Sequence, residues 1–266
     1  MQKSLSTFRW YDNLWAALIF FTRLPFWRLY QPPKSSYAAV VEWWPLTGWI
    51  TAITMAAVVY FGSMVMPVHI AVVMAITARL LLTGALHEDG LADFIDGFGG
   101  GGTDRERVLT IMKDSHIGTY GVIGLIIYFA LLYNVLLLMT PRMAALAILA
   151  ADPFSKMVAS QLVLMMPYAR TAETAKNKTV YRKPSVKAGI SLSLQGLIPM
   201  AFFCWIFNED AEWTMFIFPP CLVMYFLYLF IWRRLRGYTG DCCGAVCLLV
   251  ELTFYLSVIV QSYISV

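Results

Sequence analysis

Long apolar segments separated by short polar connections dominate the chain. Most of them are close to the roughly 20 residues that an α-helix needs to cross the hydrocarbon core of a bilayer. In chain order they are residues 43–66, 68–86, 120–140, 143–166, 188–207, 213–232 and 244–266. This pattern predicts an all-α fold, a polytopic integral membrane helical bundle with about seven transmembrane helices.

The N-terminal apolar run, residues 15–27, does not fit a complete span. It is short, it is interrupted by Arg23 and Pro25, and basic residues flank it on both sides. An interfacial or re-entrant helix is the better prediction for such a segment. A cleaved signal peptide is not expected, because no small-residue cleavage site follows the run.

Composition supports a membrane protein and excludes an ordinary soluble domain. Hydrophobic residues make up 59% of the chain and aromatic residues 15%, and the mean hydropathy is +0.66. No internal repeat or low-complexity tract divides the chain, so we expect one integral membrane domain over residues 1–266 with the lipid bilayer as its partner. The net charge of +4 is expected to reflect basic inner loops and not nucleic-acid binding. The five cysteines lack zinc-ligand spacing and are expected to be packing residues.

The distribution of charge in the loops predicts an orientation. The connection at residues 167–187 is rich in lysine and arginine, which places it on the cytoplasmic side, whereas the acidic turn at residues 208–212 falls outside. Counting spans from there brings residues 87–118 and 233–243 to the cytoplasmic face as well. The catalytic loops are therefore expected there, with the C-terminus on the outer side.

The stretch HEDGLADFIDGFGGGG, residues 87–102, holds four acidic residues and six glycines. If it is helical, Asp89, Asp93 and Asp96 share one face. Three carboxylates so close repel one another unless a cation neutralises them, and oxygen ligands of this kind suit Mg²⁺. The glycines are expected to let the backbone approach a bulky anion. The alternative is an acidic surface loop with a flexible tail.

Two further polar segments lie on the same predicted face. Thr103 is expected to cap a short amphipathic helix that is followed by a cluster of a cation, an acid and an imidazole near residues 113–118. For this helix the plain alternative is a structural role at the bilayer surface. Asp241 opens the last span, where it is either a helix cap or a fourth metal ligand.

Four charged residues fall inside predicted spans and are expected to face the bundle interior, because exposure to lipid is costly. Asp152 and Lys156 are spaced four residues apart and are expected to pair with each other. Arg79 and Glu251 lie at similar depth, and they either floor a cavity or form an ion pair that joins two helices.

Three motifs together resemble the adenosylcobinamide-GDP ribazoletransferases, the cobalamin (5′-phosphate) synthase family. They are HEDGLADFIDG, IMKDSHIGTYG and GYTGDCCGA, with Glu251 beyond the last, and weaker similarities are FFTRLP, WPLTGW and PYAR. All occur in the family's order across nearly the whole chain. The sequence departs from the family pattern at His116, where arginine is expected, at Glu88, where an apolar residue is usual, and at Leu248, where an acidic residue is common.

The resemblance implies a Mg²⁺-dependent, multi-pass enzyme of the bacterial cytoplasmic (inner) membrane, with its active site facing the cytoplasm. Such an enzyme joins α-ribazole, or its 5′-phosphate, to adenosylcobinamide-GDP, and it releases GMP with adenosylcobalamin or its 5′-phosphate. The sequence leaves open whether the chain acts alone or as a homo-oligomer.

The motifs and the chemistry of phosphoryl transfer together suggest roles for individual residues. The expected metal ligands are Asp89, Asp93, Asp96 and Asp241. The expected substrate-binding residues are Arg105, Lys113, Ser115, Arg170, Gly240 and Glu251. The candidate catalytic residues are His87, Asp89, Asp93, Asp114 and His116. The general base is left open among His87, His116 and the carboxylates.

Two other classes of function stay open at this point. A membrane CDP-alcohol phosphotransferase or prenyltransferase also uses acidic, Mg²⁺-binding helices, and it differs in its substrates. A transporter would use Arg79, Asp152 and Glu251 as an ion path. The acidic segment is predicted in a cytoplasmic loop and not at the midplane of the membrane, which favours the enzyme.

Overall fold

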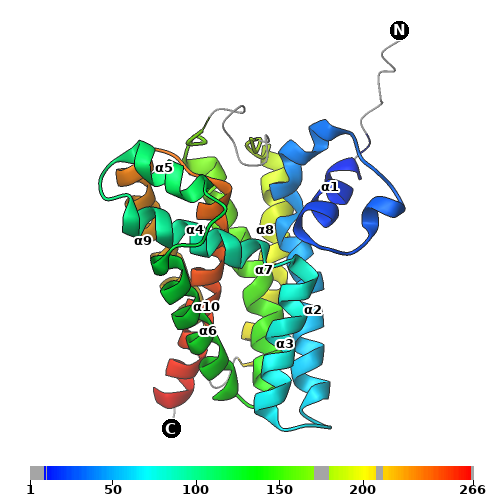
Figure 1. Cartoon of the computed structure of the whole chain (residues 1–266). Helices are drawn as coiled ribbons and strands as arrows, with labels where there is room; N and C mark the ends of the chain where they lie inside the picture. The colour runs from blue at the N-terminus through cyan, green and yellow to red at the C-terminus, as the bar shows by residue number, and fades with distance from the viewer. Residues whose placement is uncertain (1–8, 10, 171–179, 208–211, 265–266) are drawn as a thin grey trace.

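The computed structural model describes residues 9, 11–170, 180–207 and 212–264, and these residues form a helical bundle without strands (Figure 1). The α-helices are α1 Asp12–Phe21, α2 Trp44–Gly62, α3 Val68–Thr83, α4 Leu86–Gly100, α5 Arg105–Lys113, α6 Thr119–Leu137, α7 Pro141–Met165, α8 Val186–Ile206, α9 Thr214–Leu235 and α10 Gly240–Ile264. A 3₁₀ segment, Lys34–Trp43, leads directly into α2. The all-α prediction is confirmed.

Among the described residues, six helical segments are long and apolar enough to cross a membrane, and the number is seven if the bent pair α3 and α4 is counted as one span. The two helices of this pair meet at an angle of 89°. The corner consists of Gly84 and Ala85, both in the left-handed region with φ of 65° and 55°. The span expected to run to residue 86 therefore ends at Thr83, and α4 lies across the end of the bundle (Figure 1).

The N-terminal segment contains a short helix, as expected. The ten residues of α1 rise about 15 Å, roughly half the thickness of the hydrocarbon core. The backbone becomes extended at Thr22, and the amide of Arg23 then donates a hydrogen bond to the carbonyl of Leu82 at 2.7 Å. The segment is thus attached to the end of α3, close to the corner before α4.

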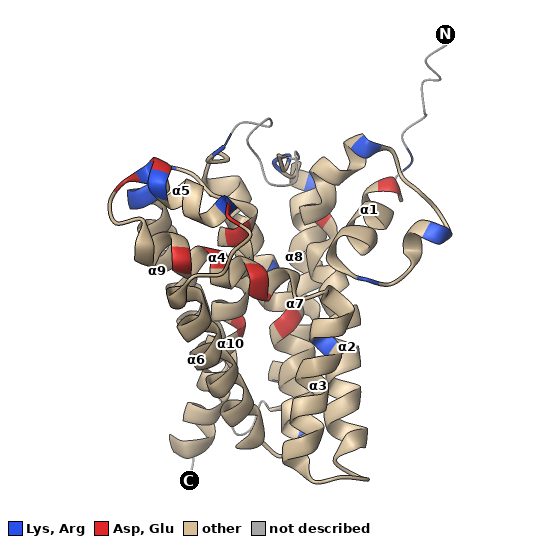
Figure 2. Ribbon diagram, viewed as in Figure 1, with Lys and Arg blue, Asp and Glu red and all other residues tan. Residues whose placement is uncertain are grey.

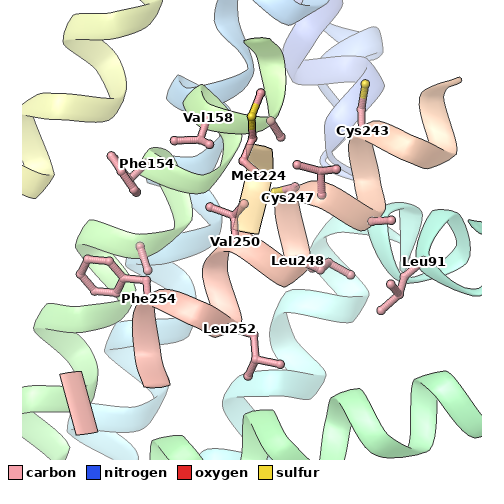
Figure 3. Packing of buried hydrophobic residues seen from close by; sticks show 14 of the residues in the cluster. Leu91, Phe154, Val158, Met224, Cys243, Cys247, Leu248, Val250, Leu252 and Phe254 are labelled. Atoms are coloured by element: carbon pink, nitrogen blue, oxygen red, sulfur yellow. The ribbon is translucent and has the colours of Figure 1, made fainter. Parts of the chain in front are cut away.

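The centre of the bundle is formed by α7 and α10, most of whose residues are buried, whereas α6, α8 and α9 lie at the periphery. Large apolar side chains such as Ile126 and Phe218 point outward there, as expected of helices that face lipid. Figure 3 shows the packing around α10, where Phe254 lies near Phe154 of α7 and Leu91 of α4 belongs to the same buried cluster. This shared buried cluster positions α4 against α10.

Among the described residues, most charged side chains gather at one end of the bundle, beside α1, α4 and α5 (Figure 2). The end of α10 lies at the opposite end (Figure 1). The polar segments singled out in the sequence therefore share one end of the molecule.

Arg79, on α3, contacts three other helices inside the bundle. Its guanidinium donates hydrogen bonds to Glu251 on α10 at 2.8 and 3.0 Å, and to the hydroxyl of Tyr128 on α6 at 2.9 Å. It also lies 3.4 Å from Glu88 on α4. Of the two alternatives for Arg79 and Glu251, the structure has the ion pair. Glu88, a departure from the family pattern, is the third charged member of this cluster.

Asp152 and Lys156 form the expected ion pair within α7, and both side chains are buried. The hydroxyl of Thr51 on α2 donates to the second carboxylate oxygen of Asp152 at 2.7 Å. Gly48 leaves the necessary space, because a Cβ atom there would lie 2.9 Å from Asp152 Oδ1. The pair therefore binds α2 to α7, and this contact explains both charges structurally.

Candidate active site

The acidic segment is helical, as the spacing of its aspartates predicts, but its glycines differ from the expectation. Gly97, Gly99 and Gly100 belong to α4, whereas Gly101 and Gly102 follow its end. A Cβ atom on Gly99 would lie 2.8 Å from the ring of Tyr120, and one on Gly97 would collide with Met112. These two glycines permit close contact of α4 with α5 and α6, so neither the flexible tail nor the bare anion-binding backbone describes them.

The contacts of Asp96 give it a structural role in the packing of α4 against α6. It is buried, and its two carboxylate oxygens accept the backbone amides of Gly118 at 2.7 Å and Gly121 at 2.8 Å. These amides belong to the start of α6, where a negative charge is favourable. Asp96 therefore fixes the loop between α5 and α6 onto α4. Among the described residues, no group of three or more His, Cys, Asp or Glu side chains is arranged to hold a metal ion by itself.

Asp89 and Asp241 line the same pocket, although they come from α4 and α10. The two helices cross closely because glycines face each other's backbone. A Cβ atom on Gly90 would lie 3.1 Å from the Cα of Asp241, and one on Gly244 would lie 3.2 Å from the carbonyl oxygen of His87. The crossing therefore brings the acidic segment and the third polar segment together.

Asp241 lies in the first turn of α10, where its negative charge is favourable, and Thr239 accepts the amides at the start of the helix. The hydroxyl oxygen of Thr239 accepts the amide of Cys242 at 3.3 Å, and the carbonyl of Thr239 accepts that of Cys243. The carboxylate of Asp241 is half-buried at the pocket, as that of Asp93 is on α4, while Asp89 is exposed. Of the expected metal ligands, Asp89 and Asp241 thus share a pocket wall, and Asp93 follows Asp89 by one helical turn.

The rest of this pocket, which we call the aromatic pocket, was not anticipated from the sequence. It has a volume of about 120 Å³. It is lined by Phe20, Phe21, Val41, Trp44, Leu86, His87, Asp89, Tyr181, Gly240, Asp241, Cys243 and Gly244. The FFTRLP and WPLTGW motifs supply three of the rings. In the sequence these motifs gave little indication of a pocket, because the segments that meet here lie far apart along the chain.

His87 is buried in the wall of the aromatic pocket. The indole nitrogen of Trp44 donates to His87 Nε2 at 3.2 Å. An indole N–H can only donate, so Nε2 is the acceptor and the neutral ring carries its proton on Nδ1. The lone pair that a general base needs is therefore already engaged at Nε2.

A second pocket, the basic pocket, brings together the three expected phosphate-binding cations. Arg105 and Lys113 come from α5 and Arg170 from the segment after α7, around a space of about 560 Å³. Arg105 donates to the carbonyl of Leu235 at 2.9 Å, and Arg170 donates to that of Leu109 at 2.8 Å. These contacts hold the two guanidinium groups in place.

The helix that supplies Arg105 and Lys113 begins differently from the prediction. Asp104, not Thr103, is the cap of α5, because its carboxylate accepts the amides of Glu106 and Arg107. The carboxylate also carries a charge that favours a helix N-terminus, which a threonine hydroxyl lacks.

The two pockets are neighbours across a short backbone crossing. The amide of Ala169 donates to the carbonyl of Tyr238 at 2.8 Å, and the amide of Tyr238 donates to that of Pro167 at 3.0 Å. Tyr168 lines the basic pocket, and burial together with the negative charge of nearby Asp241 raises its pKa to about 12. Tyr168 therefore remains neutral at ordinary pH between the basic pocket and the acidic pair.

Asp114, Ser115 and His116 lie in the exposed loop between α5 and α6 and line neither pocket. The backbone amide of His116 donates to Asp114 at 3.0 Å, and the imidazole Nδ1 lies 2.8 Å from the same oxygen. The amide hydrogen bond is the main cause that lowers the pKa of Asp114. Glu251, another expected substrate-binding residue, is buried in the bundle, where Arg79 and Tyr255 donate to it.

Comparisons with known proteins find relatives over nearly the whole chain. The family model described as cobalamin-5-phosphate synthase matches residues 13–259. An adenosylcobinamide-GDP ribazoletransferase of Leptospira interrogans is 33% identical and covers 94% of this chain and 96% of its own. Relatives of the same name from Shewanella frigidimarina and Leptothrix cholodnii are 33% and 36% identical, covering 97% and 90% of this chain and 98% and 92% of their own. No solved structure matches. The chain therefore belongs to the cobalamin-5-phosphate synthase family, and it is a polytopic membrane enzyme of the transferase class.

Proposed function

We propose that this chain joins adenosylcobinamide-GDP to α-ribazole or its 5′-phosphate, the reaction that completes the nucleotide loop of cobalamin. The products are adenosylcobalamin, or its 5′-phosphate, and GMP. The names of its relatives support this reaction. The structural observation that carries the proposal is the meeting of Asp89 and Asp241 in one pocket, next to a second pocket that contains three cations.

The carboxylates fit a Mg²⁺ ion that is shared with the substrate. Mg²⁺ commonly takes one or two protein carboxylates and completes its shell with water and substrate phosphates. Asp89 and Asp241 would hold the ion with the pyrophosphate, and Asp93 would assist from the next turn of α4. The ion would supply charge neutralisation at the pyrophosphate oxygens. We leave Asp96 outside this set because its oxygens hold the start of α6.

The chain's own residues would bind and orient the reacting groups. Arg105, Lys113 and Arg170 would hold phosphate oxygens in the basic pocket, where arginine is suited to bidentate contact. The ribose hydroxyl of the acceptor attacks the phosphorus that carries cobinamide, a new P–O bond forms, and the bond to GMP breaks.

The proton of the attacking hydroxyl passes to a carboxylate of Asp89 or Asp93. We exclude His87 as the base because Trp44 already donates to its Nε2 atom. His116 lines neither pocket.

We further propose that the enzyme lies in the bacterial cytoplasmic membrane with this end of the bundle toward the cytoplasm. The charged connections at this end support that orientation through the positive-inside rule. Water-soluble substrates would then reach the site directly from the cytoplasm.

The test is GMP release by purified protein supplied with adenosylcobinamide-GDP and α-ribazole 5′-phosphate, with Mg²⁺ or with EDTA. We expect release that requires both the acceptor and Mg²⁺. Replacing Asp89, Asp93 or Asp241 by Asn should reduce kcat at least 100-fold, about 2.7 kcal/mol of transition-state stabilisation. Asp104→Asn is the matched control, because Asn caps a helix as well as Asp does. Absence of release from folded protein, or full activity of the Asn variants, would contradict the proposal.

A further inference from the structure

The aromatic pocket contains more than phosphate chemistry requires. Phe21, Trp44 and His87 present nearly parallel rings, with centroids 5.3 to 6.2 Å apart and interplanar angles of 6° to 14°. All three side chains are buried. Parallel rings in the lining of a pocket suit contact with a flat aromatic ligand, because ring faces gain by stacking.

The size of the pocket limits what can enter it. An apolar cavity of about 150 Å³ holds a molecule such as benzene. The aromatic pocket, of about 120 Å³, is slightly smaller but open on one side, so it can enclose one ring of a planar ligand while the rest of the ligand lies in its opening. The corrin macrocycle of the other substrate is far too large for this space.

The polar groups of the inner wall further narrow the choice. Because His87 Nε2 accepts from Trp44, the neutral ring carries an N–H at Nδ1, and no described residue accepts a hydrogen bond from it. Trp44, Phe21 and Leu86 offer no acceptor on this side. The acceptors of the lining are the carboxylates of Asp89 and Asp241, which hold the metal ion under the proposed function, and the hydroxyl of Tyr181. Against the apolar part of the lining a guanine ring would lose hydrogen bonds, whereas a base with one ring acceptor loses none.

The pocket is positioned beside the acidic pair. Asp89 and Asp241 lie in its lining, so that a ring held inside has its attached sugar near these carboxylates. Tyr181 forms the outer wall of the pocket, and the hydrogen bonds of its neighbour hold it in place. The next residue, Arg182, donates its amide to Ala38 at 2.6 Å and its guanidinium to Glu42 at 2.9 Å.

We propose that the aromatic pocket binds the base of the acceptor, the benzimidazole ring of α-ribazole, with His87 Nδ1–H donating to the ring nitrogen that carries no sugar. This inference rests on the proposed function and adds a determinant of base choice to it. Phe21, Trp44 and His87 form the wall against which the base lies, and Gly240 borders the space beside Tyr181.

The first test fills the pocket at Gly240. Within the described part of the chain, a Cβ atom there meets only Tyr181 Oη, at 3.7 Å, so Gly240→Val should fold. Gly189→Val is the matched control, because nothing lies within 4 Å of a Cβ atom at that position. We expect Gly240→Val to raise KM for α-ribazole 5′-phosphate about tenfold and KM for adenosylcobinamide-GDP less than twofold. An increase confined to the GDP substrate, or no change in either KM, would overturn the proposal.

The second test uses the wild-type enzyme, so that it does not depend on the folding of a variant. We compare α-ribazole 5′-phosphate with an analogue in which the free ring nitrogen is replaced by C–H. Loss of one hydrogen bond should lower kcat/KM about three- to tenfold. Equal use of both acceptors would remove the donor role of His87. If the wild-type protein releases no GMP with either acceptor, the proposed function itself fails. Binding of α-ribazole to wild type and to Gly240→Val, measured by equilibrium dialysis, then tests the pocket alone.

Discussion

Removal of Arg79 should destabilise the whole bundle, because this one side chain neutralises two buried carboxylates. Arg79, Glu88 and Glu251 are each no more than 3% exposed. In Arg79→Met, Glu251 keeps only the hydroxyl of Tyr255, at 2.6 Å, and Glu88 loses its only partner among the described residues. Breaking a buried ion pair from one side costs about 3–5 kcal/mol, and we expect a loss of that size in the free energy of unfolding.

The measurement is reversible unfolding of purified protein in mixed detergent micelles, for Arg79→Met, Glu251→Gln and the double variant. Because Gln carries no charge, Arg79→Met should cost less in the Glu251→Gln background than in wild type. The coupling between the two positions should be about 1–3 kcal/mol. Arg79→Lys, which keeps the charge but not the fork of donors, should lie between Met and wild type. The reasoning is refuted if Arg79→Met unfolds within about 0.5 kcal/mol of wild type.

Three further predictions concern other contacts. Asp96→Ala should cost about 1–3 kcal/mol in thermal unfolding, because two amides at the start of α6 lose a charged acceptor; an unchanged melting temperature would contradict that role. Lys156→Met should destabilise more than Lys156→Met combined with Asp152→Asn, since the single change leaves a buried carboxylate without its cation; the reverse order would exclude the pair. The pKa of Tyr168 is raised from 10.0 to about 12, so its neutral form contributes stability that is complete below pH 10 and lost as the pH rises to 12. Ultraviolet titration against Tyr168→Phe should show one phenol that ionises late, and a difference spectrum centred at pH 10 would disprove it.

Hydropathy located the long helices because the thickness of a bilayer fixes both their length and their composition. It failed at the corner after α3, where Ala85 adopts a left-handed conformation that no sequence pattern signals. Hydropathy alone therefore could not show that α4 leaves the line of its span.

The spacing of the acidic residues correctly predicted a helix, but it gave all three aspartates the same role. The structure distinguishes them through partners from elsewhere in the chain. Asp96 is engaged by amides more than 20 residues away, and Asp89 is brought to Asp241 by a helix crossing at Gly90 and Gly244. Sequence adjacency likewise grouped His116 with the site, although its loop lies outside both pockets.

The bent pair α3–α4 has a consequence for the surrounding lipid. With 16 residues, α3 rises about 24 Å, several ångströms less than the hydrocarbon core, whereas the 25 residues of α10 rise about 37 Å. Where α3 alone crosses the membrane, we expect the lipid beside it to thin to match it, at a cost that grows with acyl chain length. We expect this edge of the protein to settle most easily in short-chain or disordered bilayers, where headgroups and water reach down to the level of the acidic helix. The acyl composition of the membrane would then determine how readily large hydrophilic molecules reach the acidic helix of the enzyme.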